Sequence, residues 1–145
     1  MIMKTSDLLK AMLEANHSIQ ITISGSSMCP IIYDGQKVTV SRAEHYTPGD
    51  IVIFQYKNEG LLAHRLLKII NGRLFCKGDN SFRIEDITEE QIIGTVILNN
   101  DRHNDLTFIE ASYSIGKLFK KCRYNSEILR SHPQYVEYAK LYLGE

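Results

Sequence analysis

The spacing of apolar residues changes twice along the chain. From Thr5 to Asn16 they recur every three or four positions, which predicts one amphipathic helix. From Ser18 the spacing becomes a strict alternation of apolar and polar residues as far as Ser24, which is typical of a half-buried β-strand. Helical spacing returns over 111–122 and 133–143. The pattern therefore predicts a β-rich middle with one helix before it and helices after it.

Turn-forming residues divide this middle into short strands. Asp34-Gly35, Pro48-Gly49-Asp50 and Asn58-Glu59-Gly60 are sequences that favour tight turns. Asn71-Gly72 lies between two apolar runs, which predicts a β-hairpin. The predicted strands cover 18–24, 37–41, 51–56, 61–70, 73–76 and 91–98, with a short helical turn at 86–90.

The chain has 145 residues, of which 43% are hydrophobic and 23% are charged, so it is long and apolar enough to form a core. No linker rich in Pro, Gly or Ser divides it. We therefore expect a single domain over 1–145, with a β core at about 18–110, an N-terminal helix at 5–16 and a C-terminal helical extension at 111–145.

Composition argues against several kinds of partner and site. The 17 Lys and Arg balance the 17 Asp and Glu, whereas nucleic-acid-binding proteins usually carry a basic excess. The three cysteines are an odd number, no two are close in sequence and they lack zinc-ligand spacing, so we expect a reduced chain and no metal site. No cofactor is expected either. A helix that spans a bilayer needs about 20 mostly apolar residues, and the sequence has no such run. We expect a cytoplasmic location, with peripheral membrane contact through Tyr135, Tyr138 and Tyr142 as the alternative to their packing on the sheet.

Two segments of the β-rich middle carry residues suited to nucleophilic chemistry. Ser27 follows the first strand within 25–30, where Gly and Pro favour a fixed turn, but a serine hydroxyl needs a base to become a nucleophile. His64 lies in the predicted strand 61–70, and histidine is well suited to proton transfer near neutral pH. Lys68 shares the predicted face of that strand and is the alternative base.

A carboxylate could hold the imidazole in place. Asp79 and Asp86 both follow the predicted base strand, and the spacing allows Glu85 as well. Asp79 belongs to a tight turn that can occupy its side chain, so Asp86 is preferred. The other histidines have no accompanying motif and are expected to face solvent: His17, His45, His103 and His132.

The order of these motifs resembles that of the signal peptidase superfamily, which also contains the self-cleaving phage and SOS repressors. The matching series is G-x-S-M-x-P, P-G-D-I-V, A-H-R, K-G-D-N and I-I-G-T-V, over about 21–98. The resemblance implies that Ser27 is the nucleophile. His64-Arg65-Leu66 is similar to the H-R-(V/I) sequence of the histidine-type members from the endoplasmic reticulum, archaea and sporulation, whereas bacterial signal peptidases and the repressors use lysine. In histidine-type relatives a later acid completes the triad, which favours Asp86 over Asp79.

The resemblance also implies a fold and a reaction. We expect a mostly-β protein built on a curled antiparallel sheet, a β-ribbon or partly open barrel, with flanking N- and C-terminal helices. The expected activity is that of a soluble serine endopeptidase that cleaves a peptide or leader after small residues. Its substrate would bind as an extended strand.

Two departures from the family pattern support a second hypothesis, a catalytically inactive peptide-binding module. Bacterial signal peptidases have a serine oxyanion donor two residues before the nucleophile, where this chain has Gly25, so the second oxyanion donor is not identified. The family's membrane-bound members carry spanning helices, and none is expected here. Self-cleavage of the repressor type is not expected either, because the chain has no Ala-Gly dipeptide.

Overall fold

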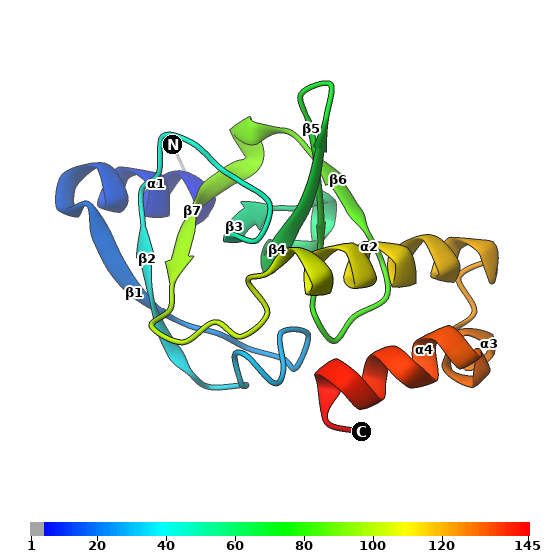
Figure 1. Cartoon of the computed structure of the whole chain (residues 1–145). Coiled ribbons are helices and arrows are strands. Elements are labelled where there is room, and N and C mark those ends of the chain that lie inside the picture. The colour runs from blue at the N-terminus through cyan, green and yellow to red at the C-terminus, as the bar shows by residue number, and fades with distance from the viewer. Residues whose placement is uncertain (1–4) are drawn as a thin grey trace.

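Residues 5–145 of the protein are described by a computed structural model, in which an antiparallel sheet is flanked by helices at both ends (Figure 1). The strands are β1 (Ser18–Thr22), β2 (Lys37–Ser41), β3 (Ile51–Gln55), β4 (Leu61–Ile70), β5 (Arg73–Lys77), β6 (Glu85–Ile87) and β7 (Ile92–Ile97). The helices are α1 (Thr5–Asn16), α2 (Leu106–Lys121), α3 (Ser126–Ser131) and α4 (Pro133–Tyr138), with short 3₁₀ turns η1 (Lys57–Glu59) and η2 (Glu89–Gln91) and a final π-helical turn η3 (Ala139–Leu143).

The seven strands form one open sheet in the order β1-β2-β7-β3-β4-β5-β6. β4 is the longest strand and connects the two halves of the sheet: Leu61–Arg65 pair with β3, and Arg65–Ile70 pair with β5. Over 61–64, the edge of β4 opposite β3 therefore pairs with no strand of the described chain. The mostly-β fold with flanking helices is as the sequence predicts.

Two apolar clusters hold the sheet in shape. The first packs Leu13 of α1 against the buried faces of β2, β3 and β7, so the amphipathic helix covers that half of the sheet. The second lies between β3, β4, β5, β6 and β7 and is centred on fully buried side chains such as Phe54 and Leu66. Burying such side chains is the main driving force for folding, at about 1.5–3 kcal/mol each.

The helices after the sheet form a third cluster. α2 lies across β4 and β5 (Figure 1), and α4 packs against α2. Phe108, Leu129, Tyr135 and Tyr138 are buried there, so Tyr135 and Tyr138 pack inside the protein, but among the C-terminal helices rather than on the sheet as expected. No helix within 5–145 combines the length and apolarity needed to cross a bilayer.

Some boundaries differ from the sequence prediction. α2 begins at Leu106 rather than Ala111, because the Asp105 side chain caps it by accepting a hydrogen bond from the Phe108 N–H at 2.9 Å. α3 was not predicted. The expected helical turn at 86–90 is wrong in its first half, since Glu85–Ile87 form a strand that pairs with β5, and only Glu89–Gln91 are helical.

Candidate active site

Ser27 lies in a loop after β1 that the chain closes and anchors tightly. The Ile23 N–H donates to the Gln36 carbonyl at 2.9 Å, which joins the two ends of the loop. Met28 and Ile32 are buried in the first apolar cluster and hold the middle of the loop against the sheet. Ser27 itself is half-buried, so its hydroxyl lies at a fixed position that a substrate can still reach.

His64 reaches this hydroxyl from the first half of β4. Its Nε2 atom lies 3.1 Å from Ser27 Oγ, within hydrogen-bonding distance. His64 is only 5% exposed, and the ring of Phe54 packs edge-on against its imidazole, with centroids 6.1 Å apart. The contact between Ser27 and His64, expected from the order of the motifs, is therefore present.

Glu85 occupies the other side of the imidazole. Its Oε1 lies 2.7 Å from His64 Nδ1, and the residue is 1% exposed. Arg83 donates from Nε to the second carboxylate oxygen, Oε2, at 3.3 Å, and its guanidinium also pairs with Glu59 at the surface. Both oxygens of the Glu85 carboxylate therefore have partners.

These contacts fix the arrangement of hydrogens in the site. An ionised carboxylate can only accept hydrogen bonds, so the proton of a neutral His64 must lie on Nδ1, facing Glu85. Nε2 is then left with a lone pair that faces Ser27 Oγ, and the hydroxyl donates to it. This tautomer is the one a general base needs in order to take a proton from a serine.

The structure corrects the expected third residue. Asp86, the preferred acid, points away from His64 and forms an exposed ion pair with Arg73 at 2.8 Å. The register of β6 explains this, because Glu85 and Ile87 face inward while Asp86 between them faces outward. Asp79 does not contact His64 either. Glu85, which the spacing allowed, is the carboxylate on the imidazole.

Lys68 was predicted to lie on the same face of β4 as His64, but it does not. A β-bulge between Leu66 and Lys68 shifts the register of β4 against β5, so the alternation of faces is broken between the two positions. Lys68 is exposed, and its Nζ lies 5.0 Å from the centre of the Tyr113 ring on α2. The only base in contact with Ser27 among the described residues is therefore His64.

The K-G-D-N turn holds the loop of Ser27 from the other side. The Asn80 N–H donates to the Ser27 carbonyl at 2.8 Å, and the Asn80 side chain donates to the Ser26 carbonyl at 3.1 Å. Gly78 lies so close that a Cβ there would be 2.7 Å from the Ser27 carbonyl oxygen and 3.1 Å from His64 Nε2. Only glycine fits at this approach, which gives the Gly of the motif a physical reason.

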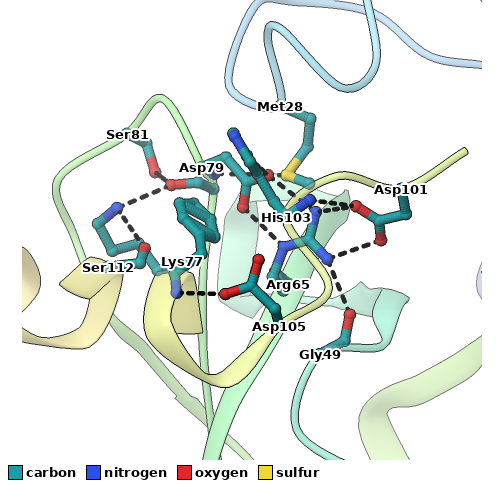
Figure 2. A network of polar contacts seen from close by, with 12 residues as sticks. Met28, Gly49, Arg65, Lys77, Asp79, Ser81, Asp101, His103, Asp105 and Ser112 are labelled. Carbon is teal, nitrogen blue, oxygen red and sulfur yellow. Dashed lines mark hydrogen bonds and ion pairs between the residues drawn. The ribbon is translucent and has the colours of Figure 1, made fainter. Parts of the chain in front are cut away.

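Asp79 belongs to a buried ion network behind that turn (Figure 2). Arg65 is fully buried and donates through Nε and Nη2 to both oxygens of Asp79 at 2.9 Å, and it also pairs with Asp101 at 2.8 Å and donates to the Gly49 carbonyl. Burial alone would raise the pKa of Asp79, but hydrogen bonds from His103 and Arg65 outweigh it and hold the pKa below its usual value. Asp79 is a structural carboxylate that fixes the turn.

His103 is the clearest residue that the sequence prediction placed wrongly. It was expected in solvent, yet it is 5% exposed, its Nδ1 lies 3.1 Å from Asp79 Oδ2, and its ring stacks on Phe108 with centroids 4.0 Å apart. It lies in a polar loop without any periodicity, so only the fold reveals its position. His103 links the segment after the sheet directly to Asp79 of the K-G-D-N turn, and Asp101 links it there through Arg65 (Figure 2).

Lys77 extends this support into the C-terminal helices. Its ammonium is fully buried and donates to the Gly78 carbonyl at 3.0 Å and to the Ser112 hydroxyl at 2.9 Å (Figure 2). The Tyr138 hydroxyl donates to the Asp79 carbonyl at 2.7 Å. Burial lowers the pKa of Lys77 to about 8, against the opposing charges of Asp79 and Glu85. α2 and α4 thus bond directly to the turn beside Ser27.

The low pKa of Lys77 predicts a pH-dependent contribution to stability. Below pH 8 both folded and unfolded chains hold the proton, but between about 8 and 10.4 only the unfolded chain keeps it, so this group makes folding more favourable as pH rises. We expect the unfolding free energy of the wild type, relative to that of Lys77→Met, to increase from pH 8 to pH 10, as measured by urea denaturation. Exposed Lys120→Met should show no such shift, and equal pH dependence in wild type and Lys77→Met would contradict the assignment.

A small hollow opens beside the Ser27 hydroxyl. It encloses about 230 Å³ and lies between the residues that end and follow β1, 21–24, and the unpaired edge of β4 at 61–64. Leu9 of α1 and Ile53 of β3 contribute apolar side chains to it. The hollow therefore offers backbone edges for an extended chain together with a small apolar pocket next to the Ser27 hydroxyl.

Other reactive side chains do not join the site. Cys29, two residues after Ser27, is a half-buried free thiol, and neither of the other cysteines pairs with it. Within 5–145, no three His, Cys, Asp or Glu side chains are grouped so that they could hold a metal ion. Among the described residues, the contacting set suited to nucleophilic chemistry is therefore Ser27, His64 and Glu85.

A comparison with known families matches the part of the chain that forms the sheet, but not the helices that follow it. A family model described as Peptidase S24-like matches residues 2–97, about two thirds of the chain, and this stretch includes Ser27, His64 and Glu85. No curated protein matches the chain. The matched stretch ends with β7, so α2, α3 and α4 lie beyond it.

Proposed function

The chain belongs to the Peptidase S24-like family, and from this premise we propose that it is a serine endopeptidase that cleaves extended peptides after small residues. The observation that carries the proposal is the continuous set of contacts from Ser27 Oγ through His64 to Glu85, at 3.1 and 2.7 Å. A peptide-binding module would have no need for a buried carboxylate on a histidine that contacts a serine.

The geometry supports a two-step reaction. Ser27 Oγ attacks the carbonyl carbon of the scissile bond while its proton passes to His64 Nε2, and Glu85 stabilises the imidazolium that forms. The imidazolium then gives the proton to the leaving amine, the C–N bond breaks, and an ester on Ser27 remains. A water molecule, deprotonated by His64, hydrolyses this ester and regenerates the hydroxyl.

The negative oxygen of the intermediate needs hydrogen-bond donors. The Gly25 N–H is occupied, since it donates to Asp34 Oδ1 at 2.8 Å. The Ser27 N–H makes no hydrogen bond within the described part of the chain, so it is free to serve as one donor. An oxyanion donor of this kind typically contributes a factor of about 10²–10³ to the rate.

The proposed substrate is a peptide in extended conformation. It would lie between the residues after β1 and the unpaired edge of β4, forming main-chain hydrogen bonds along one or both edges. The hollow of about 230 Å³ beside Ser27 would take a small side chain just before the cleaved bond. Histidine-type signal peptidases, which the H-R-L sequence resembles, are the suggested model for this chemistry.

A peptide library tests the proposal without knowledge of the natural substrate. We expect the wild-type protein to cleave a mixture of synthetic 14-residue peptides of diverse sequence, with small residues enriched before the cut, as read by mass spectrometry of the new ends. Ser27→Ala should produce none of these ends while unfolding at a similar temperature. Peptide binding by the wild type without new ends would instead support the inactive binding module.

A further inference from the structure

Arg83 is the outermost member of the row of contacts that begins at Ser27. Its Nε donates to Glu85 Oε2 at 3.3 Å, while Oε1 of the same carboxylate lies 2.7 Å from His64 Nδ1. Among residues 5–145, no other donor contacts Oε2. Each oxygen of this buried carboxylate thus has one partner, and the two-step reaction gives a role to His64 but none to Arg83.

The guanidinium of Arg83 is itself held by residues that precede the base strand β4. Its Nη1 and Nη2 donate to the two carboxylate oxygens of Glu59 at 3.0 Å each, a bidentate geometry that fixes the plane of the guanidinium. Its central carbon also lies 5.0 Å from the centre of the ring of Tyr56, a buried residue. Arg83 therefore ties Glu85 to the η1 turn from a fixed position.

The backbone between Arg83 and Glu85 is fixed by helix α2. Ile84 lies against Gly116 of that helix so closely that a Cβ at position 116 would overlap the Ile84 side chain. Gly116 is buried, so this contact belongs to the interior of the protein. With Ile84 packed on α2, the side chains on either side of it reach Glu59 and His64.

From these contacts we propose that Arg83 is a positioning residue that holds the Glu85 carboxylate on His64, an inference that rests on the proposed function. A glutamate side chain has three rotatable bonds, and one hydrogen bond to Nδ1 leaves its carboxylate free to turn. A second contact on Oε2, from a guanidinium that is itself held, removes this freedom. Oε1 then stays on Nδ1 while His64 takes and returns the proton.

A second ion pair on the same strand supplies a matched control. Arg73 pairs with Asp86, the neighbour of Glu85, and its side chain is about as exposed as that of Arg83. Exposed pairs of this kind contribute little to stability. Arg73→Met therefore removes a comparable surface pair without touching the carboxylate on His64, and the unfolding temperatures of both variants show whether each remains folded.

The test measures kcat and KM separately on a peptide selected from the library. We expect Arg83→Met to lower kcat about 10–100-fold with KM nearly unchanged, as loss of an outer partner does for the oriented ligands of metal sites. Arg73→Met should keep the wild-type kcat. Arg83→Lys should recover part of the loss, because an ammonium can contact one carboxylate but lacks the fork that binds Glu59 with two parallel hydrogen bonds.

A double variant shows whether Arg83 acts through Glu85. Once Glu85→Gln has removed the carboxylate, Arg83→Met should cause no further loss of kcat, whereas independent effects would multiply. Multiplied losses, a wild-type kcat in Arg83→Met or a change confined to KM would overturn this inference and leave the proposed peptidase intact. Absence of any Ser27-dependent cleavage by the wild type would overturn both.

Discussion

Replacing His64 with alanine is expected to reduce peptide cleavage by about 10⁵–10⁶-fold, while Lys68→Ala leaves it close to the wild-type rate. His64 Nε2 is the only base in contact with Ser27 Oγ among the described residues, whereas Lys68 is exposed and lies over the Tyr113 ring. Without the imidazole, the hydroxyl keeps its proton at neutral pH and is a weak nucleophile. The measurement is kcat/KM on a peptide selected from the library.

Two controls keep the expected loss from being read as misfolding. His64→Ala leaves Glu85 buried beside a cavity, so its unfolding temperature should be compared with that of the wild type. Free imidazole, added at millimolar concentration, fits that cavity and should restore part of the activity in His64→Ala but none in Ser27→Ala. A loss of activity in Lys68→Ala with an active His64→Ala would show that the family's lysine mechanism operates here instead.

The sheet could be predicted well from the sequence because its signals are local. Alternation of apolar and polar residues and turn sequences such as Asn71-Gly72 located β1, β2, β3, β4, β5 and β7, and the helical spacing gave α1 from Thr5 to Asn16. The contact between Ser27 and His64 followed from the order of family motifs rather than from local pattern. Whether these residues are catalytic remains a prediction for the experiments above.

The position of Glu85 could have been found from alternation had β6 been recognised as a strand. Ile87 is an apolar residue that would face inward, and two residues earlier on the same face stands Glu85, while Asp86 must face outward. The three residues of β6 are too few for a period to be visible, and the acidic run around them suggests a turn. Asp86 was therefore placed beside His64 because β6 was not recognised as a strand.

The support behind the K-G-D-N turn could not be predicted for a different reason. His103, Asp101 and Tyr138 are 24, 22 and 59 positions from Asp79 and come from a loop and a helix that carry no motif. Their contacts depend on how α2 and α4 pack on the sheet, and this packing joins residues that are far apart in the sequence. Arg65 is buried within this network, but its partners were not visible in the sequence.

Glu85→Gln is expected to lower kcat by about 10⁴-fold with the fold retained, as for a triad acid whose loss leaves the imidazole in the wrong tautomer. The amide keeps the size of the side chain, but its NH₂ group can donate to Nδ1, which places the ring proton on Nε2 and removes the lone pair that faces Ser27. Asp86→Asn is the matched control one position away, and it should keep wild-type turnover and stability because that carboxylate is exposed.

Asp79→Asn completes the comparison, because it changes a buried carboxylate that contacts Arg65 and not His64. Asp79 accepts two of the hydrogen bonds that the buried Arg65 donates, and removing one partner of such a pair typically costs about 3–5 kcal/mol of stability. We therefore expect its unfolding free energy to fall by that amount, while Glu85→Gln loses turnover at nearly wild-type stability, both measured by urea denaturation and peptide cleavage. A wild-type rate in Glu85→Gln, or a large loss in Asp86→Asn, would show that the carboxylate on His64 is not the one that supports catalysis.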